Sequence, residues 1–242
     1  MRNSSDSESA AATMPNLVVE SAPPGPWKLN YTCYYKLKDT RKCALLVDDV
    51  QEEYRKFFPD GFVPPLVKTV NAARAAGIPI IYSHYSRVDD SDGHYNALDD
   101  VYGPYGHCMA NPATKTNPMY LSGAEGNKIA SEVAPAAGDP ILPSKVLDCF
   151  ANYSRDGKSM LKEWLHSKGV DTLVLTGAWT DDCILSTAVR AVNEDFNAVV
   201  VEDAVFTCTS VKDEALAVMR HAYCLMTTAD EISAYWKKNP QA

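Results

Sequence analysis

The segment 172–193 places a cysteine where a thiol could serve as a nucleophile. Its first residues form an apolar, partly β-branched run typical of a buried strand, and this run stops at Gly177. From Ile184 to Val192 the apolar residues recur at helical spacing. Cys183 is therefore predicted to lie in the first turn of a helix that follows a buried strand. Free backbone N–H groups and the helix dipole at such a position favour the thiolate over the thiol.

The same backbone could also stabilise the product of a thiolate attack. N–H groups at a helix start can donate to the oxygen that becomes negative when a thiolate adds to a carbonyl group. Asp181 and Asp182 oppose the charge of the thiolate, so a cation elsewhere has to offset them. A cysteine on an apolar helix face is more often inert packing, so the catalytic interpretation requires partners from the rest of the chain.

Two groups with suitable chemistry follow other apolar runs. Cys43 to Val47 is typical of a buried strand, and Asp48 and Asp49 come directly after it, while Lys145 follows a short predicted strand at 140–143. Carboxylates at the end of an apolar strand are costly unless they face a cleft, and clefts of open parallel sheets lie beyond the carboxyl ends of strands. A carboxylate there could take the thiol proton and pass it to a leaving group, while an ammonium would lower the pKa of the thiol.

Predicted strands and helices alternate along the rest of the chain. Pro64 opens a helix that Gly77 closes, and Ser210 to Asp213 resembles a capping box. We expect an α/β fold with a doubly wound, mostly parallel sheet of about six strands flanked by helices, a Rossmann-like architecture. The remaining predicted strands are 78–82, 198–201 and 224–227, and the remaining predicted helices are 126–134, 160–168, 215–223 and 229–236.

Two segments lack this alternation. Residues 1–30 are polar and interrupted by prolines, which predicts a disordered N-terminal arm and leaves 31–242 as a single domain. Residues 84–125 are rich in Asp, Asn, Gly, Pro and Tyr and are too long for a simple connection, so this loop is expected to border or cover a site.

Composition excludes several classes of protein. A net charge of −8 argues against a nucleic-acid or anionic-membrane surface, and no apolar stretch is long enough to span a membrane. The N-terminus lacks the apolar region of a secretory signal. The seven cysteines form no C-x-x-C pair, which favours reduced thiols over disulfides or a zinc site. These features predict a cytoplasmic protein, and no cofactor is expected.

The segments around Asp49, Lys145 and Cys183 resemble three motifs of the isochorismatase-like cysteine hydrolases. This resemblance covers about residues 40 to 235. Segment 44–51, Ala-Leu-Leu-Val-Asp-Asp-Val-Gln, is similar to the family's first-strand motif, in which the aspartate two residues before glutamine is catalytic. This points to Asp49. Lys145, with Phe150 shortly after it, is similar to the second motif.

The third motif is the most specific. Segment 177–183, Gly-Ala-Trp-Thr-Asp-Asp-Cys, followed by Ser-Thr-Ala at 186–188, is similar to the family's nucleophile motif. The family's metal-binding nicotinamidase branch carries Asp-x-His and a further His after the second strand, whereas 83–87 reads Ser-His-Tyr-Ser-Arg, so no metal is implied here. The resemblance implies a catalytic triad of Asp49, Lys145 and Cys183, a cis peptide between Ala178 and Trp179, and an oxyanion hole from the N–H groups of Trp179 and Cys183.

Several further residues are candidates for substrate binding. Tyr54, Tyr85, Phe150 and Trp179 could line an apolar pocket, although aromatic residues beside a core mostly belong to the core. Arg87 could hold a substrate carboxylate with two hydrogen bonds, or it could be a surface arginine.

The favoured function is cysteine-dependent hydrolysis of a C–N bond in a small amide or ureide, through a thioester acyl-enzyme. The resemblance leaves isochorismatase activity as an alternative, with Asp49 acting as an acid on a vinyl ether. That reaction does not require a cysteine, so the presence of Cys183 favours amide chemistry. A non-catalytic binding protein on the same fold is a second alternative. The family resemblance also leads us to expect a homo-oligomer, a dimer or tetramer.

Overall fold

The computed structural model describes residues 42–86 and 122–241. The chain divides into two units, Met1–Lys38 and Asp39–Ala242, and every described residue belongs to the second. The predicted arm, most of the predicted loop at 84–125, and Arg87 lie outside the described residues. Within the described part of the chain, no helix combines the length and the apolar character needed to cross a bilayer.

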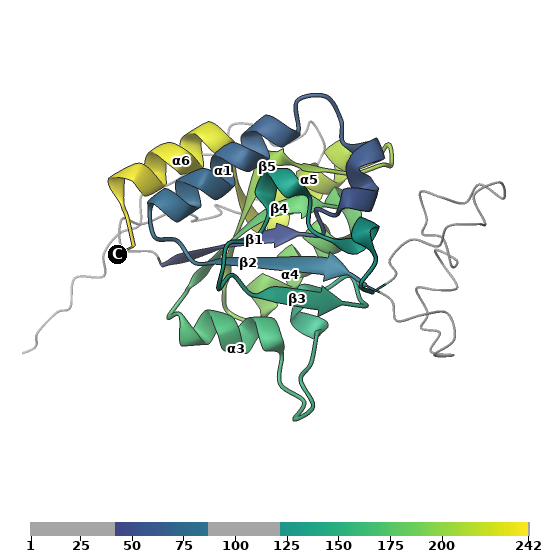
Figure 1. Cartoon of the computed structure of the whole chain (residues 1–242). Coiled ribbons are helices and arrows are strands. Elements are labelled where there is room, and N and C mark those ends of the chain that lie inside the picture. Colours follow the sequence, from purple (N-terminus) through teal and green to yellow (C-terminus); the bar gives the residue numbers. More distant parts are fainter. Residues whose placement is uncertain (1–41, 87–121, 242) are drawn as a thin grey trace, which may run out of the picture. The chain divides into compact units, whose positions relative to one another are not determined.

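One sheet of six strands forms the centre of the second unit (Figure 1). All neighbouring strands pair in parallel, so the predicted doubly wound sheet is confirmed. The order β3-β2-β1-β4-β5-β6 runs outward in both directions from β1 and β4, which makes the crevice between these two strands the topological switch point. The strands are β1 Cys43–Asp48, β2 Ile80–Tyr85, β3 Ile141–Ser144, β4 Thr172–Ala178, β5 Asn197–Phe206 and β6 Cys224–Thr227.

Helices cover both faces of the sheet. Helices α1 (Val63–Ala75) and α6 (Ala229–Lys238) lie side by side on one face, and α3 (Met160–Ser167) lies on the other (Figure 1). Helices α4 (Leu185–Asn193) and α5 (Lys212–Ala222) complete the set of longer helices in the described residues. The short turns are the 3-10 helices η1 Glu52–Phe57, η5 Glu125–Asn127, η6 Ser131–Val133 and η7 Cys149–Ala151, and the π-helical turn η8 Thr180–Ile184.

Helix ends follow the local sequence at some positions and not at others. Prolines occupy the first turn of α1, where their missing N–H groups have no helical partner to lose. A capping box exists at α6, between Thr228 and Glu231. The capping box predicted at Ser210 to Asp213 is wrong, because α5 begins after Val211 with no side-chain cap.

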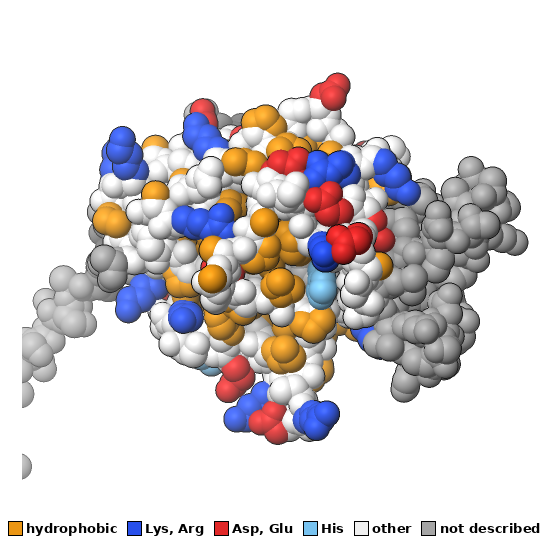
Figure 2. All heavy atoms as spheres, in the orientation of Figure 1, with side chains coloured by type: hydrophobic (Ala, Val, Ile, Leu, Met, Phe, Trp, Pro, Cys, Tyr) orange, Lys and Arg blue, Asp and Glu red, His pale blue; other side chains and the backbone are white. Residues whose placement is uncertain are grey.

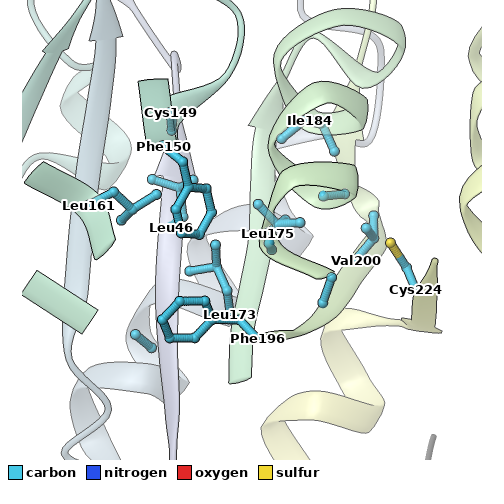
Figure 3. Close-up of a cluster of buried hydrophobic side chains, with 14 of the residues drawn as sticks. Leu46, Cys149, Phe150, Leu161, Leu173, Leu175, Ile184, Phe196, Val200 and Cys224 are labelled. Atoms are coloured by element: carbon cyan, nitrogen blue, oxygen red, sulfur yellow. The ribbon is translucent and has the colours of Figure 1, made fainter. Parts of the chain in front are cut away.

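A large apolar cluster fills the space between the sheet and its α3 and α4 face (Figure 3). Leu46, Leu173 and Leu175 contribute to it from the central strands, and Leu161 and Ile184 meet them from the helical layer. This cluster extends to the carboxyl end of the sheet, because Cys149 and Phe150 of η7 belong to it.

The cysteines are not all reduced. Cys43, Cys149, Cys183 and Cys224 are free and buried. Cys208 is disulfide-bonded, so the prediction of reduced thiols is wrong at this position. Wide and unpaired spacing in the sequence does not exclude a disulfide at Cys208, and the cysteine pattern therefore gives no support for a reducing compartment.

Candidate active site

Asp49 follows β1 directly and turns its carboxyl group into the protein. Its backbone adopts φ 49°, the left-handed region that is unfavourable for residues other than glycine. The backbone N–H of Asp49 donates to Ser83 Oγ at 3.0 Å, which ties this turn to β2. The residue is only 1% exposed. A strained turn thus holds a carboxyl group inside the carboxyl end of the sheet.

Cys183 reaches the same place from β4. The peptide between Ala178 and Trp179 is cis, and the chain then forms η8 before α4 begins. The N–H groups of Asp182 and Ile184 both donate to the carbonyl oxygen of Trp179, at 3.1 Å each. Cys183 therefore lies in a π-helical turn directly ahead of α4, instead of in the first turn of an α-helix as predicted, and it is 3% exposed.

The side chains of Asp49 and Cys183 lie beside each other and interact. Burial raises the pKa of Asp49 to about 6, and hydrogen bonds from Ser83, Cys183 and the backbone of Tyr85 limit this rise. Burial, followed by the negative charge of Asp49, raises the pKa of Cys183 well above its usual value. At neutral pH the thiol is therefore protonated and lies beside an ionised carboxylate. The resting thiolate expected from the helix start alone is not favoured here.

Gly177 lets β4 approach β1 beside this pair. Strand β4 runs through Gly177 to Ala178, so the predicted end of the strand is wrong. Gly177 has φ 109° and pairs with Asp48, and a Cβ atom at this position would lie 2.0 Å from the carbonyl oxygen of Asp48. Only glycine fits, because a side chain would push apart the two strands that carry Asp49 and Cys183.

Three polar groups around Asp49 were not among the predicted site residues. Ser83 Oγ donates to Asp49 Oδ1 at 2.9 Å and also contacts Asp48 Oδ1. Cys149 Sγ donates to the same oxygen of Asp48 at 3.3 Å. Asp48 and Asp49 were recognised as a pair at a strand end, but no local sequence signal links them to Ser83 or Cys149.

Lys145 follows β3, and its side chain is exposed. Strand β3 is two positions from β1 in the sheet, so Lys145 belongs to the same carboxyl end as Asp49 and Cys183. Asp49 and Cys183 are the two predicted triad members that lie beside each other. That the Lys145 ammonium group also lies close to them stays a prediction.

The aromatic candidates lie at different depths. Trp179 is buried against Tyr54, with ring centroids 4.6 Å apart, and against Phe206 at 5.1 Å. Phe150 is buried in the apolar cluster and packs on Phe196 at 5.8 Å. Trp179 directly precedes the η8 turn that carries Cys183, and Tyr54 packs on it. Phe150 belongs to the apolar core, so it does not line a pocket.

Tyr85 ends β2 and contributes its backbone to the site. The side chain of Gln51 makes two hydrogen bonds with the backbone of Tyr85. Its Oε1 accepts from the N–H of Tyr85 at 2.8 Å, and its Nε2 donates to the carbonyl oxygen of Tyr85 at 3.2 Å. Asn127 donates to the same carbonyl at 2.8 Å. The glutamine of the first-strand motif thus fixes the strand that holds Ser83 beside Asp49.

An apolar cleft of about 340 Å³ lies elsewhere on the described surface. Ile129, Pro135 and Ile141 are among its lining residues, together with His84. Figure 2 shows hydrophobic side chains around a histidine on this face. None of the described lining residues belongs to the predicted triad. Among the residues that the structure describes, no three His, Cys, Asp or Glu side chains are grouped so that they could hold a metal ion.

Comparisons with known proteins agree with the fold and with the motifs. The family model described as the isochorismatase domain matches residues 43–231. Maleamate amidohydrolase from Pseudomonas putida is 36% identical over 91 residues, which are 36% of this chain and 40% of that protein. Isochorismatase from Bacillus subtilis is 27% identical over 198 residues, which are 78% of this chain and 57% of that protein. The chain therefore matches less than two thirds of the length of either relative.

A solved structure supports the architecture. The crystal structure of a cysteine hydrolase from Pseudomonas syringae pv. phaseolicola superposes with a TM-score of 0.68. It is 19% identical in sequence, and the match covers 82% of this chain and 93% of that one. At this level of identity the likeness concerns the fold.

Proposed function

Because the chain belongs to the isochorismatase domain family, we propose that it is a cysteine-dependent hydrolase that cleaves the C–N bond of a small amide or ureide. The observation that carries the proposal is the buried Cys183 thiol beside the buried Asp49 carboxyl group at the carboxyl end of the sheet. A nucleophile and a base already in contact are what acyl transfer requires. The similarity to maleamate amidohydrolase supports an amide substrate.

The first half of the reaction forms a thioester. Asp49 takes the thiol proton as the sulfur of Cys183 attacks the carbonyl carbon of the substrate, which gives a tetrahedral intermediate. The N–H groups of Trp179 and Cys183 are the proposed donors to its oxyanion. Asp49 then returns the proton to the leaving nitrogen, the C–N bond breaks, and ammonia or an amine departs.

The second half releases the acid. Asp49, ionised again, takes a proton from a water molecule, and the resulting hydroxide attacks the thioester carbonyl. The C–S bond breaks, the proton returns to sulfur, and the carboxylic acid leaves. Lys145 is the proposed cation that offsets the negative charge of the site during both halves. No metal or cofactor takes part in this proposal.

Isochorismate hydrolysis is the second candidate. The pKa of Asp49, about 6, is high enough for part of the protein to carry a protonated carboxyl group near neutral pH, and a vinyl ether needs such an acid. The similarity to the Bacillus subtilis isochorismatase supports the same reading. The two reactions differ in their need for sulfur, so one substitution separates them.

The decisive experiment measures turnover of small amides, ureides and isochorismate by the full chain and by Cys183→Ala. For C–N hydrolysis we expect Cys183→Ala to lower kcat by at least about 10³-fold, because the nucleophile is gone. Cys224→Ala is the matched control, since Cys224 is also free and buried but lies in β6. Amide turnover that survives in Cys183→Ala would refute the cysteine mechanism, and surviving isochorismate turnover would establish the second candidate.

A binding protein without activity is tested by alkylation. In the proposed hydrolase, Asp49 withdraws the proton of Cys183, so a low dose of iodoacetamide should label Cys183 before Cys43 and Cys224. Mass spectrometry of the labelled peptides measures the order. Equal, slow labelling of the three cysteines would instead indicate a fold without a working nucleophile.

A further inference from the structure

Asp48 places a second carboxyl group in the core beside the proposed base. Alternation along β1 directs Ala44 and Leu46 into the apolar cluster, and Asp48 is the next residue on that face. It is 0% exposed, and in the described part of the chain its Oδ2 has no hydrogen-bond partner. An ionised carboxylate with an unpaired buried oxygen would be very costly. The mechanism above does not use this residue.

The number of hydrogens at Ser83 indicates that one of the two carboxyl groups, Asp48 or Asp49, is protonated. Ser83 Oγ accepts from the N–H of Asp49 and contacts one oxygen of Asp48 and one of Asp49. A hydroxyl group has one hydrogen to donate, so it can serve only one of these two oxygens. The other contact is a hydrogen bond only if that carboxyl group is protonated and donates to Ser83.

The remaining partners decide which carboxyl group holds the proton. Asp49 also lies beside the Cys183 thiol and the backbone of Tyr85, and both groups lower its pKa and so favour a negative charge on it. Asp48 has only the weak thiol donor of Cys149 at 3.3 Å and an oxygen without a partner. The anion is therefore better placed on Asp49 and the proton on Asp48.

We propose that Asp48 is a positioning residue that stays protonated at neutral pH and donates to Ser83, whose hydroxyl then donates to Asp49. This chain directs the one negative charge of the pair to Asp49, on the side that faces Cys183. The catalytic meaning of the chain rests on the proposed function. The position of the proton does not, because it follows from the hydrogen bonds alone.

The titratable groups around Asp48 favour the same state. Burial, and next the charge of Asp49, raise the pKa of Asp48 well above its usual value, and Asp148 of the η7 segment adds to the rise. Hydrogen bonds with Ser83 and Cys149 reduce it in part. The titratable groups that act on Asp48 and its neighbour include Asp49 directly after β1, Asp148 and Cys149 at η7, and Cys183 in η8.

Infrared difference spectroscopy of the full chain at neutral pH tests the proton directly. The wild-type minus Asp48→Asn spectrum should contain the carbonyl band of a protonated carboxyl group, because asparagine keeps the shape and the donor but has no such band. Asp148→Asn is the control and should leave the band in place, since asparagine caps η7 as well as aspartate does. If Asp48→Asn does not fold, carboxyl-carbon NMR of wild type labelled in aspartate makes the same measurement. An ionised Asp48 in either experiment overturns the proposal.

The pH dependence of Cys183 alkylation by iodoacetamide tests the positioning role. Ser83→Ala should move the midpoint of this dependence to higher pH, because the Ser83 hydrogen bond lowers the pKa of Asp49. Ser83→Thr keeps the hydroxyl group and should restore the wild-type midpoint. Asp48→Asn should leave the midpoint in place if Asp48 is neutral, and a clear fall of the midpoint would show that Asp48 was charged.

These readouts separate the two proposals. A chain that hydrolyses none of the substrates tested still gives the infrared band and the alkylation midpoints if the proton lies on Asp48. Conversely, loss of turnover in Cys183→Ala together with an ionised Asp48 would support the hydrolase and reject the proton-holding role.

Discussion

At the residue scale, the chemistry of the site depends on how far Asp49 is removed from water. If the Asp49 carboxyl group were fully exposed to water, it would be a weak base. If it were buried without hydrogen-bond donors, it would be a neutral acid that cannot accept a proton. Hydrogen bonds from Ser83 and Cys183 hold the group between these limits, with a pKa of about 6. A base of this strength is ionised at neutral pH and can still release its proton to a leaving group.

This environment predicts the acid limb of the activity. In the proposed mechanism the base works only when Asp49 is ionised, so kcat/KM should fall as the pH drops through about 6, instead of through the ordinary aspartate value of 3.8. A pH series of kcat/KM, or of the Cys183 alkylation rate if the substrate is unknown, measures the midpoint. A midpoint near the ordinary aspartate value would mean that burial does not control this group.

The sequence identified the two groups in contact but not their surroundings. Asp49 and Cys183 stand in short motifs at strand ends, and the parallel sheet brings such ends together. Ser83 lies inside a strand pattern with nothing to mark it, and its role arises only because β2 pairs with β1. Cys149 likewise meets Asp48 through tertiary packing. Contacts of this kind depend on register, which local patterns do not contain.

At the element scale, Gly177 should be indispensable. Gly177→Ala forces a Cβ atom against the carbonyl of Asp48 at 2.0 Å and imposes a positive φ on alanine. We expect the free energy of unfolding to fall by about 3 kcal/mol or more, and the labelling of Cys183 to slow, since β4 must move away from β1. Urea denaturation and alkylation of the folded fraction measure the two effects. Gly138→Ala is the control: φ is also positive there, but nothing lies near the added Cβ. If the free energy of unfolding fell equally in both variants, the close approach of Gly177 to Asp48 would not be what makes this glycine necessary.

Element boundaries show where local patterns stop being informative. Strand β5 does not end at 201, where the sequence predicts its end. It continues to Phe206, since Val205 and Phe206 pair with Gly177 and Ala178 beyond the bulge in β4. The helix predicted at 126–134 is instead two short 3-10 turns, and Ile129 between them forms a bridge with Gln51. In both cases a partner distant in sequence decides the conformation.

At the scale of the whole described unit, the strand order explains why the site lies where it does. β1 and β4 are adjacent at the switch point, so the turns after them open into one crevice although they are far apart in the chain. The order was not deducible from the alternation of elements, which fits several doubly wound sheets. The existence of a common carboxyl end was deducible, and it was sufficient to bring Asp49 and Cys183 together.

The buried acids should also make stability depend on pH in an unusual direction. A carboxyl group whose pKa is raised on folding favours the folded state fully below its unfolded pKa, and this contribution is lost as the pH rises through the folded pKa. For Asp49 the window runs from 3.8 to about 6, which corresponds to about 3 kcal/mol of lost stability at neutral pH. Wild type should therefore gain about 1 kcal/mol or more when the pH is lowered from about 7 to about 5.

Asp49→Asn should remove the part of this dependence that comes from Asp49, and in the proposed mechanism it also abolishes activity. The variant has no charge to bury at residue 49, so its free energy of unfolding should exceed that of wild type near neutral pH, and the pH dependence that remains should come from Asp48, which stays protonated in the folded state. Glu132 provides the opposite case, because Arg55 lowers its pKa to about 2 and its contribution is lost only at lower pH. That pair is exposed and contributes little, so Glu132→Gln is a suitable control. Urea denaturation at the two pH values measures the free energy of unfolding of all three proteins. If Asp49→Asn were less stable than wild type near neutral pH, this would contradict the free-energy cost assigned to the buried charge of Asp49.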